Sequence, residues 1–223
     1  MRENLTELVF ILDRSGSMSG LESDTIGGFN SLIEKQQKEE GDAIVSTVLF
    51  DDVCEVIHDR EDIGKVEKLT DKEYYVRGCT ALLDAVGGAI HHIGNIHKYA
   101  RDEDRPAKTL FVITTDGLEN ASRRYSYPEV KRMIERQKKR YNWEFLFLGA
   151  NIDSVQVAAQ MGISPQMAAN YHSDSVGTSL NYMVLERTIS RVRQCGAREM
   201  NDLFEDGEWK ADIDRDYAAR EKK

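Results

Sequence analysis

Residues 8–20 read LVFILDRSGSMSG, and this stretch decides the fold. The first five residues, Leu8–Leu12, are all apolar. A run that is apolar on both faces is typical of a central strand in a parallel sheet that helices cover on both sides. The residues that follow, Asp13–Gly20, are mostly polar or small. The stretch therefore predicts a buried parallel strand that ends in a polar, glycine-bearing loop.

The rest of the chain alternates between predicted strands and predicted helices. Strands are expected where runs rich in β-branched and aromatic residues occur, and helices where apolar residues recur at helical spacing. The two runs on either side of Asp51-Asp52 predict a hairpin, which places one antiparallel strand at an edge of the sheet. These two hairpin strands are 43–50 and 53–57, and the later predicted strands are 109–114, 143–148 and 167–171. The predicted helices are 26–40, 81–99, 127–140, 153–161 and 179–194. This order predicts an α/β fold with a doubly wound, Rossmann-like, mostly parallel sheet, one antiparallel edge strand and helices on both faces.

Composition and charge narrow the classes of function. The chain has 30 Lys and Arg against 39 Asp and Glu, a net charge of −9, which argues against binding to a phosphate backbone or an anionic bilayer. Its apolar runs are far shorter than the roughly 20 residues of a membrane-spanning helix, and its first residues do not lead into a signal peptide. Its three cysteines lack CxxC spacing, so neither a disulfide framework nor a thiolate zinc site is indicated. We expect a reduced, cytoplasmic protein that binds neither nucleic acid nor membrane.

Polar side chains follow the predicted strands at the end of the sheet where open α/β folds bind ligands. Asp13, Ser15 and Ser17 occupy alternate positions in the first loop, Thr80 precedes the second large helix, and Asp116 closes the fourth strand. Two carboxylates and three hydroxyls, without histidine or thiolate, form a hard-oxygen set suited to Mg²⁺ or Mn²⁺. The sequence therefore predicts one divalent metal site.

These residues resemble the metal-ion-dependent adhesion site of the von Willebrand factor type A domain. The resemblance rests on Asp-Arg-Ser-Gly-Ser at 13–17, on Thr-Ala-Leu-Leu-Asp-Ala from Thr80, and on Thr-Asp-Gly at 115–117. It spans roughly residues 6–195 and is to the stand-alone members of bacterial or phage-related type. It implies that Ser15, Ser17 and Thr80 donate oxygens to the ion, while Asp13 and Asp116 bind it directly or through water. It also implies that Asp84 orients residues behind the site.

The chain shows no internal repeat and no linker rich in Pro or Gly, which predicts one domain over residues 1–200, followed by a charged tail at 201–223. The charged residues after Leu203 predict a solvated extension, with a partner-binding peptide as the alternative. Histidines at 91, 92 and 97 are expected on the surface, and Cys79 as a small buried thiol.

The resemblance implies a metal-dependent protein-binding module and not an enzyme. Ligands that are largely neutral hydroxyls leave the cation with much of its charge, so a Glu or Asp of a partner protein gains strongly by binding it. An exposed cation can also polarise a phosphoryl group, so the alternative is a metal-dependent phosphohydrolase that uses Asp13 and Asp116. The sequence contains no P-loop, no second Asp two residues after Asp13 and no GxSxG motif, which disfavours catalysis. A third possibility is a regulatory module whose closing helix, 179–194, moves with metal occupancy.

Overall fold

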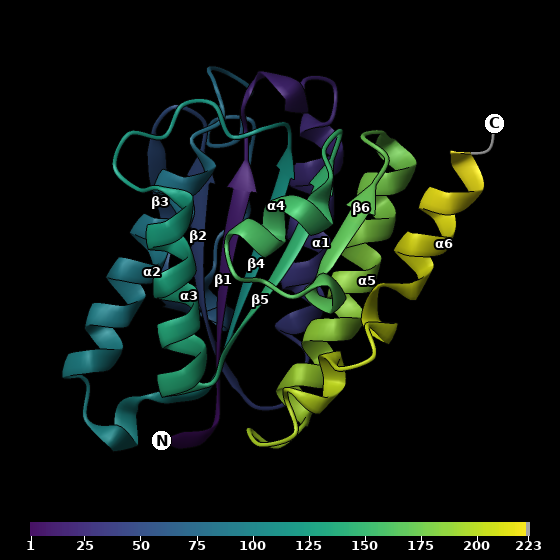
Figure 1. Cartoon of the computed structure of the whole chain (residues 1–223). Coiled ribbons are helices and arrows are strands. Elements are labelled where there is room, and N and C mark those ends of the chain that lie inside the picture. Colours follow the sequence, from purple (N-terminus) through teal and green to yellow (C-terminus); the bar gives the residue numbers. More distant parts are fainter. Residues whose placement is uncertain (222–223) are drawn as a thin grey trace.

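The computed structural model, which describes residues 1–221, contains one six-stranded sheet in the order β3-β2-β1-β4-β5-β6 (Figure 1). All neighbouring strands are parallel except β3, which pairs antiparallel with β2 at one edge. The strands are β1 (Arg2–Asp13), β2 (Asp42–Phe50), β3 (Cys54–Asp62), β4 (Pro106–Asp116), β5 (Trp143–Ala150) and β6 (Ala168–Tyr171). The predicted doubly wound sheet with one antiparallel edge strand is confirmed.

Helices form a layer on each face of the sheet (Figure 1). One layer contains α2, α3 and α4, and the other contains α1 and α5, with α6 beside β6 and α5. Among residues 1–221 no helix combines the length and the apolar character needed to cross a membrane. The helices are α1 (Glu22–Gln36), α2 (Leu82–Tyr99), α3 (Tyr127–Tyr141), α4 (Ser154–Gln160), α5 (Ser175–Gln194) and α6 (Ala211–Arg220).

The boundaries of α3 show how local sequence sets a helix. Ser126 and Glu129 form a capping box at its start, with Pro128 in the first turn as its sequence predicts. The helix ends at Tyr141 and is capped by Asn142, whose left-handed backbone (φ 55°) suits asparagine better than most residues. Strand β5 then begins one residue later, so the short connection keeps α3 packed against the sheet.

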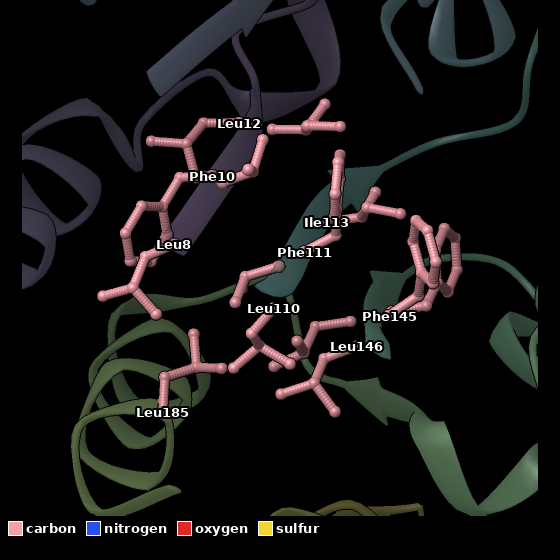
Figure 2. Packing of buried hydrophobic residues seen from close by; sticks show 14 of the residues in the cluster. Leu8, Phe10, Leu12, Leu110, Phe111, Ile113, Phe145, Leu146 and Leu185 are labelled. Atoms are coloured by element: carbon pink, nitrogen blue, oxygen red, sulfur yellow. The ribbon is translucent and has the colours of Figure 1, made fainter. Parts of the chain in front are cut away.

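The core lies between the central strands and both helical layers (Figure 2). Every residue of β4 and of β5 is buried, as the continuous apolar runs predict. The rings of Phe111 and Phe145 stack across the β4–β5 pair with centroids 4.7 Å apart, and Leu8 of β1 and Leu185 of α5 are also buried in this core. Each such side chain contributes about 1.5–3 kcal/mol by leaving water. This core fixes the positions at which β1 and β4 end.

Residues 204–221 are not a solvated extension, so that expectation is wrong for them, and residues 222–223 of the predicted tail lie outside the described residues. Phe204, Trp209 and Ile213 are buried, Trp209 Nε1 donates to Gln166 O at 2.7 Å, and α6 covers the β6 edge of the sheet. Lys210 Nζ also donates to Ala168 O of β6 at 2.6 Å, and covering an edge strand in this way protects it from pairing with another chain.

Two expectations about single residues are also wrong. His97 is fully buried and not on the surface, because its Nε2 lies 2.5 Å from Oε2 of the equally buried Glu7. Cys79 is exposed and not buried. His91 and His92 lie on the surface as expected.

Candidate metal site at the carboxyl ends of the strands

The five predicted ligand residues lie together at the carboxyl ends of β1 and β4. Asp13 and Asp116 are the last residues of these two neighbouring strands. The Thr80 hydroxyl donates to Ser15 Oγ at 3.0 Å, and Ser15 Oγ and Ser17 Oγ lie 3.0 Å apart. Ser17 is exposed, whereas the other four residues are at least 97% buried. The site is therefore a nearly buried set of oxygens that reaches solvent at Ser17.

Asp13 is held by donors from its own loop and from β4. Its Oδ1 accepts the Ser15 amide at 2.7 Å, and its Oδ2 accepts the Thr115 hydroxyl at 2.6 Å and the Asp116 amide at 3.3 Å. Burial raises the pKa of Asp13 above its ordinary value, although these hydrogen bonds act in the opposite direction. Three donors leave one of the roughly four acceptor positions of a carboxylate for a cation or its water.

Asp116 is oriented by two residues that the sequence reasoning missed. Asn151 Nδ2 donates to Asp116 Oδ1 at 2.5 Å, and the Ser173 hydroxyl donates to Asp116 Oδ2. Asn151 follows β5 and Ser173 follows β6, so both lie at the same end of the sheet as the predicted ligands. The rule that singled out residues after β1 and β4 would have found them if applied to every strand.

The backbone around Thr80 is fixed by the loop after β4. Asn120 Oδ1 accepts the Thr80 amide at 2.9 Å, and the Asn120 amide donates to Thr80 O at 3.0 Å. Glu119 Oε2 accepts the amide of Leu83 in the first turn of α2 at 2.9 Å. Asn120 and Glu119 were not predicted, because nothing in their spacing marks them as partners of Thr80 and Leu83, about 40 positions earlier. Their bonds hold the Thr80 backbone in the position from which its hydroxyl donates to Ser15.

Asp84, which the family pattern places behind the site, has a different role in the structure. Its carboxylate accepts the backbone amides of Arg123, Arg124 and Tyr125 at 2.8–3.0 Å. Asp84 therefore anchors the loop between β4 and α3 to the start of α2. Its influence on the site passes through that loop.

Gly117 leaves the space beside the hydroxyls open. A Cβ at this position would lie 3.2 Å from Ser17 Oγ and 3.7 Å from Thr80 Oγ1, and the residue has a positive φ of 149°. Neighbouring ligands of an octahedral ion with bonds of about 2.0–2.1 Å are separated by about 2.9 Å. The observed 3.0 Å spacings between hydroxyl oxygens match that value. The residues present therefore fit a small divalent cation.

The donor set of the site consists of oxygen atoms alone. Within residues 1–221 there is no group of three or more His, Cys, Asp or Glu side chains arranged to hold a metal. The five residues supply two carboxylates and three hydroxyls, which suit Mg²⁺ or Mn²⁺ better than ions that prefer nitrogen or sulfur.

Comparisons with known proteins support the fold. No protein-family model matches the chain, and no curated protein matches it. Proximal thread matrix protein 1 from the mussel byssus is similar in structure, with 14% identity, a TM-score of 0.56, and 83% of this chain and 46% of that one covered. A von Willebrand factor type A protein from Catenulispora acidiphila matches with 13% identity and a TM-score of 0.53 over 84% and 42% of the two chains.

Two of the similar structures contain a metal ion. Manganese-loaded TRAP protein of Plasmodium vivax has 15% identity and a TM-score of 0.51, over 81% of this chain and 74% of that one. A further structure of the mussel protein has zinc in its metal-ion-dependent adhesion site, with 13% identity, a TM-score of 0.55, and 84% and 46% of the chains covered. The chain spans about half the length of the mussel protein. These similarities place the chain among proteins with the von Willebrand factor type A fold, a class in which some members bind divalent metals.

Proposed function

We propose that this protein is a divalent-metal-dependent protein-binding module. Ser15, Ser17 and Thr80 bind Mg²⁺ or Mn²⁺ through their hydroxyls, and Asp13 and Asp116 bind it directly or through water. The single observation that carries the proposal is the spacing of the three hydroxyl oxygens, 3.0 Å in each neighbouring pair, beside the open space at Gly117. The structural similarity to metal-loaded proteins of the same fold supports it.

The hydrogen bonding of the two carboxylates favours binding over hydrolysis. Asp13 accepts three protein donors and Asp116 accepts two. Their charge is therefore shared with these donors, so a cation beside them keeps more of its charge than in a site of free carboxylates. A phosphohydrolase that used Asp13 or Asp116 as its nucleophile or base would need that carboxylate free. Nothing within residues 1–221 favours that alternative.

The partner that fits such an ion presents a Glu or Asp carboxylate. Ser17 and Gly16 are exposed, so a partner reaches the ion from the loop side of the sheet. An incoming carboxylate completes the coordination and neutralises the remaining charge, which makes the complex depend on the metal. We propose that this complex forms in the cytoplasm.

Titration calorimetry of chelator-treated protein with Mn²⁺ tests the metal site. The wild type should bind one ion, and the double variant Ser15→Ala/Asp116→Ala should show no measurable binding. The matched control, Ser31→Ala/Asp71→Ala, changes the same residue types at exposed positions outside the site and should bind like wild type. Equal binding by the wild type and the site variant would overturn the proposal.

A pull-down from host lysate, with Mg²⁺ and with chelator, identifies the partner. Affinity for the purified partner should then fall roughly thirtyfold or more on chelation or in Thr80→Ala, because loss of a desolvated charge contact costs about 2–5 kcal/mol. Affinity that stays within about twofold in both cases would show that the partner uses another surface.

A further inference from the structure

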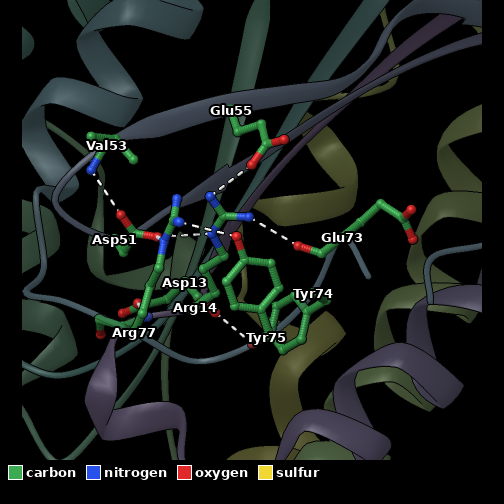
Figure 3. Close-up of polar contacts among 10 residues, drawn as sticks. Asp13, Arg14, Asp51, Val53, Glu55, Glu73, Tyr74, Tyr75 and Arg77 are labelled. Carbon is green, nitrogen blue, oxygen red and sulfur yellow. Dashed lines mark hydrogen bonds and ion pairs between the residues drawn. The ribbon is translucent and has the colours of Figure 1, made fainter. Parts of the chain in front are cut away.

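The loops that carry the hydroxyl ligands are joined behind the site by one buried carboxylate (Figure 3). Asp51, in the turn between β2 and β3, has a fully buried side chain. Its Oδ2 accepts Nε of Arg14 at 2.9 Å and Nε of Arg77 at 2.8 Å. Arg14 lies between Asp13 and Ser15 in the first ligand loop, and Arg77 lies three residues before Thr80. Asp51 therefore connects the two segments whose hydroxyls meet.

Arg14 extends this connection with its remaining donors. Its Nη1 donates to Glu73 O at 2.9 Å, and its Nη2 forms an ion pair with Glu55 Oε2 at 2.8 Å without hydrogen-bond alignment. Its side chain is fully buried although it carries a charge. A buried guanidinium is tolerated only when it is paired in this way, and its planar fork fixes the geometry of its partners.

The aromatic and backbone contacts around the same group add to its rigidity. The Tyr75 ring lies near both guanidinium groups, 5.3 Å from the carbon of Arg14 and 5.2 Å from that of Arg77. The neighbouring Tyr74 hydroxyl donates to Asp13 O at 2.5 Å, and the Gly16 amide donates to Gly78 O at 3.2 Å. The two ligand segments are thus held together by side chains and by backbone.

Gly78 has a backbone conformation that suits glycine. Its φ is +66°, which side chains other than glycine's rarely adopt. A Cβ there would lie 2.0 Å from Oδ1 of the exposed Asp52 side chain, which would have to turn aside. Gly78 therefore suits the turn that places its carbonyl on the Gly16 amide.

We propose that Asp51, with Arg14 and Arg77, sets the distance between the Ser15 and Thr80 hydroxyls and so makes the site selective for Mg²⁺ and Mn²⁺ over Ca²⁺. The three residues are positioning residues, since none of them touches the ion. This inference rests on the metal site proposed above, and it states which ions that site prefers and which residues set the preference.

The difference in ion size explains how such a connection produces selectivity. Ca²⁺ takes six to eight oxygens at about 2.3–2.6 Å, and neighbouring ligands in a six-coordinate site would lie about 3.4 Å apart. A closer spacing suits Ca²⁺ only with seven or eight oxygens around the ion, more than the five side chains here supply. The hydroxyls of Ser15 and Thr80 are 3.0 Å apart, and moving them outward would stretch the bonds that Asp51 accepts from both arginines. If the connection through Asp51 is loosened, the site can expand. Its affinity for Mg²⁺ and Mn²⁺ then falls, while its affinity for the larger Ca²⁺ is kept.

Titration calorimetry of the full chain with Mn²⁺ and separately with Ca²⁺ tests the inference, using Asp51→Asn and Arg77→Gln. Asp51→Asn keeps the shape of the side chain and removes its charge. Asp51→Asn changes a buried side chain and could prevent folding. The Arg77 side chain is 41% exposed, so Arg77→Gln should fold and still tests the inference in that case. Each variant should lose about 10–100-fold in Mn²⁺ affinity, the usual effect of removing a residue behind a metal ligand, and should lose less than about threefold in Ca²⁺ affinity.

The matched control is Asp42→Asn, which removes the exposed Arg2–Asp42 ion pair far from the site and should change neither affinity. A ratio of Mn²⁺ to Ca²⁺ affinity that stays at the wild-type value in Arg77→Gln would overturn the inference. An equal loss of both affinities would also overturn it, because it would show a merely structural role. Failure of the wild type to bind Mn²⁺ would instead contradict the proposed metal site itself.

Discussion

Asn151 Nδ2 lies 2.5 Å from Asp116 Oδ1, which joins the end of β5 to the end of β4. Asn151 has a left-handed backbone with φ 55°, a conformation that asparagine adopts more readily than most residues. The amide side chain is thereby directed at the carboxylate. This contact shows that the proposed metal site is built from loops beyond those that supply its ligands.

Removing that amide should weaken the metal site without removing a ligand. Asn151→Ala leaves Asp116 held by the Ser173 hydroxyl alone, so Mn²⁺ affinity should fall by about 10–100-fold. Calorimetric titration measures the change, and Asn95→Ala, at an exposed position of α2, is the matched control. Mn²⁺ affinity equal to that of the control would mean that Asn151 does not orient Asp116.

The role of Gly117 can be tested by adding one methyl group. In Gly117→Ala the new Cβ lies 3.2 Å from Ser17 Oγ at a backbone conformation with φ 149°, so the variant should lose about 1–3 kcal/mol of unfolding free energy and bind Mn²⁺ more weakly. Gly27→Ala in α1, where a Cβ meets nothing within 4 Å, should gain up to about 1 kcal/mol. Urea unfolding compares the two variants, and similar effects of both would contradict this account.

Much of the fold follows from sequence because the signals are local. The apolar run at 8–12 and the runs that became β4 and β5 are buried for their whole length, and the hairpin at Asp51-Asp52 needs only two neighbouring segments. The tail was misjudged because Phe204, Trp209 and Ile213 stand among charged residues without a helical apolar period. Their burial depends on β6 and α5 being present to receive them.

The site was predictable where its residues follow strands, and not where they depend on distant partners. The five predicted side chains are brought together by the strand order, which the alternation of elements implies. The burial of His97 was not predicted because its partner, Glu7, lies 90 residues away in the sequence. The burial of Arg14 was not predictable either, because the sequence around it does not indicate its ion pairs with Asp51 and Glu55. Burial of a polar residue depends on such pairing, which spacing along the chain does not reveal.

Metal removal should weaken the fold without abolishing it. The core of β1, β4 and β5 contains none of the five proposed ligands except the strand-terminal Asp13 and Asp116. An ion at about 100 times its dissociation constant adds only about 2.7 kcal/mol of unfolding free energy. Urea unfolding with and without Mg²⁺ measures the difference. A chelated protein without secondary structure by circular dichroism would refute this expectation.

The stability of the fold should decrease as the pH falls below about 6.5, the ordinary pKa of histidine, partly because of His58. This side chain is 3% exposed, and its Nδ1 lies 3.0 Å from Thr47 Oγ1. Burial lowers its pKa, although the nearby carboxylates of Glu61 and Glu67 oppose the shift. The unfolded chain therefore takes up a proton at a higher pH than the folded chain does. The contribution of His58 to the unfolding free energy is fully present above the pKa that this residue has in the unfolded chain. It is lost as the pH falls toward the lower pKa that it has in the folded chain.

The slope from one such group is at most about 1.4 kcal/mol per pH unit. Urea unfolding at about pH 7.5 and about pH 5.5, on either side of the ordinary pKa, should show a smaller loss for His58→Gln than for wild type. His91→Gln, at an exposed position, should behave like wild type. Equal losses in all three proteins would contradict the assignment to His58.

The most direct measurement of the central claim is the anomalous scattering of Mn²⁺ in crystals of chelator-treated protein that has been reloaded with the ion. One strong peak is expected at the ends of β1 and β4, with Ser15, Ser17 and Thr80 oxygens bonded to it at about 2.1 Å and one coordination position filled by solvent or by a carboxylate from outside the chain. A peak at any other group of side chains, or no peak beside these three hydroxyls, would contradict the claim.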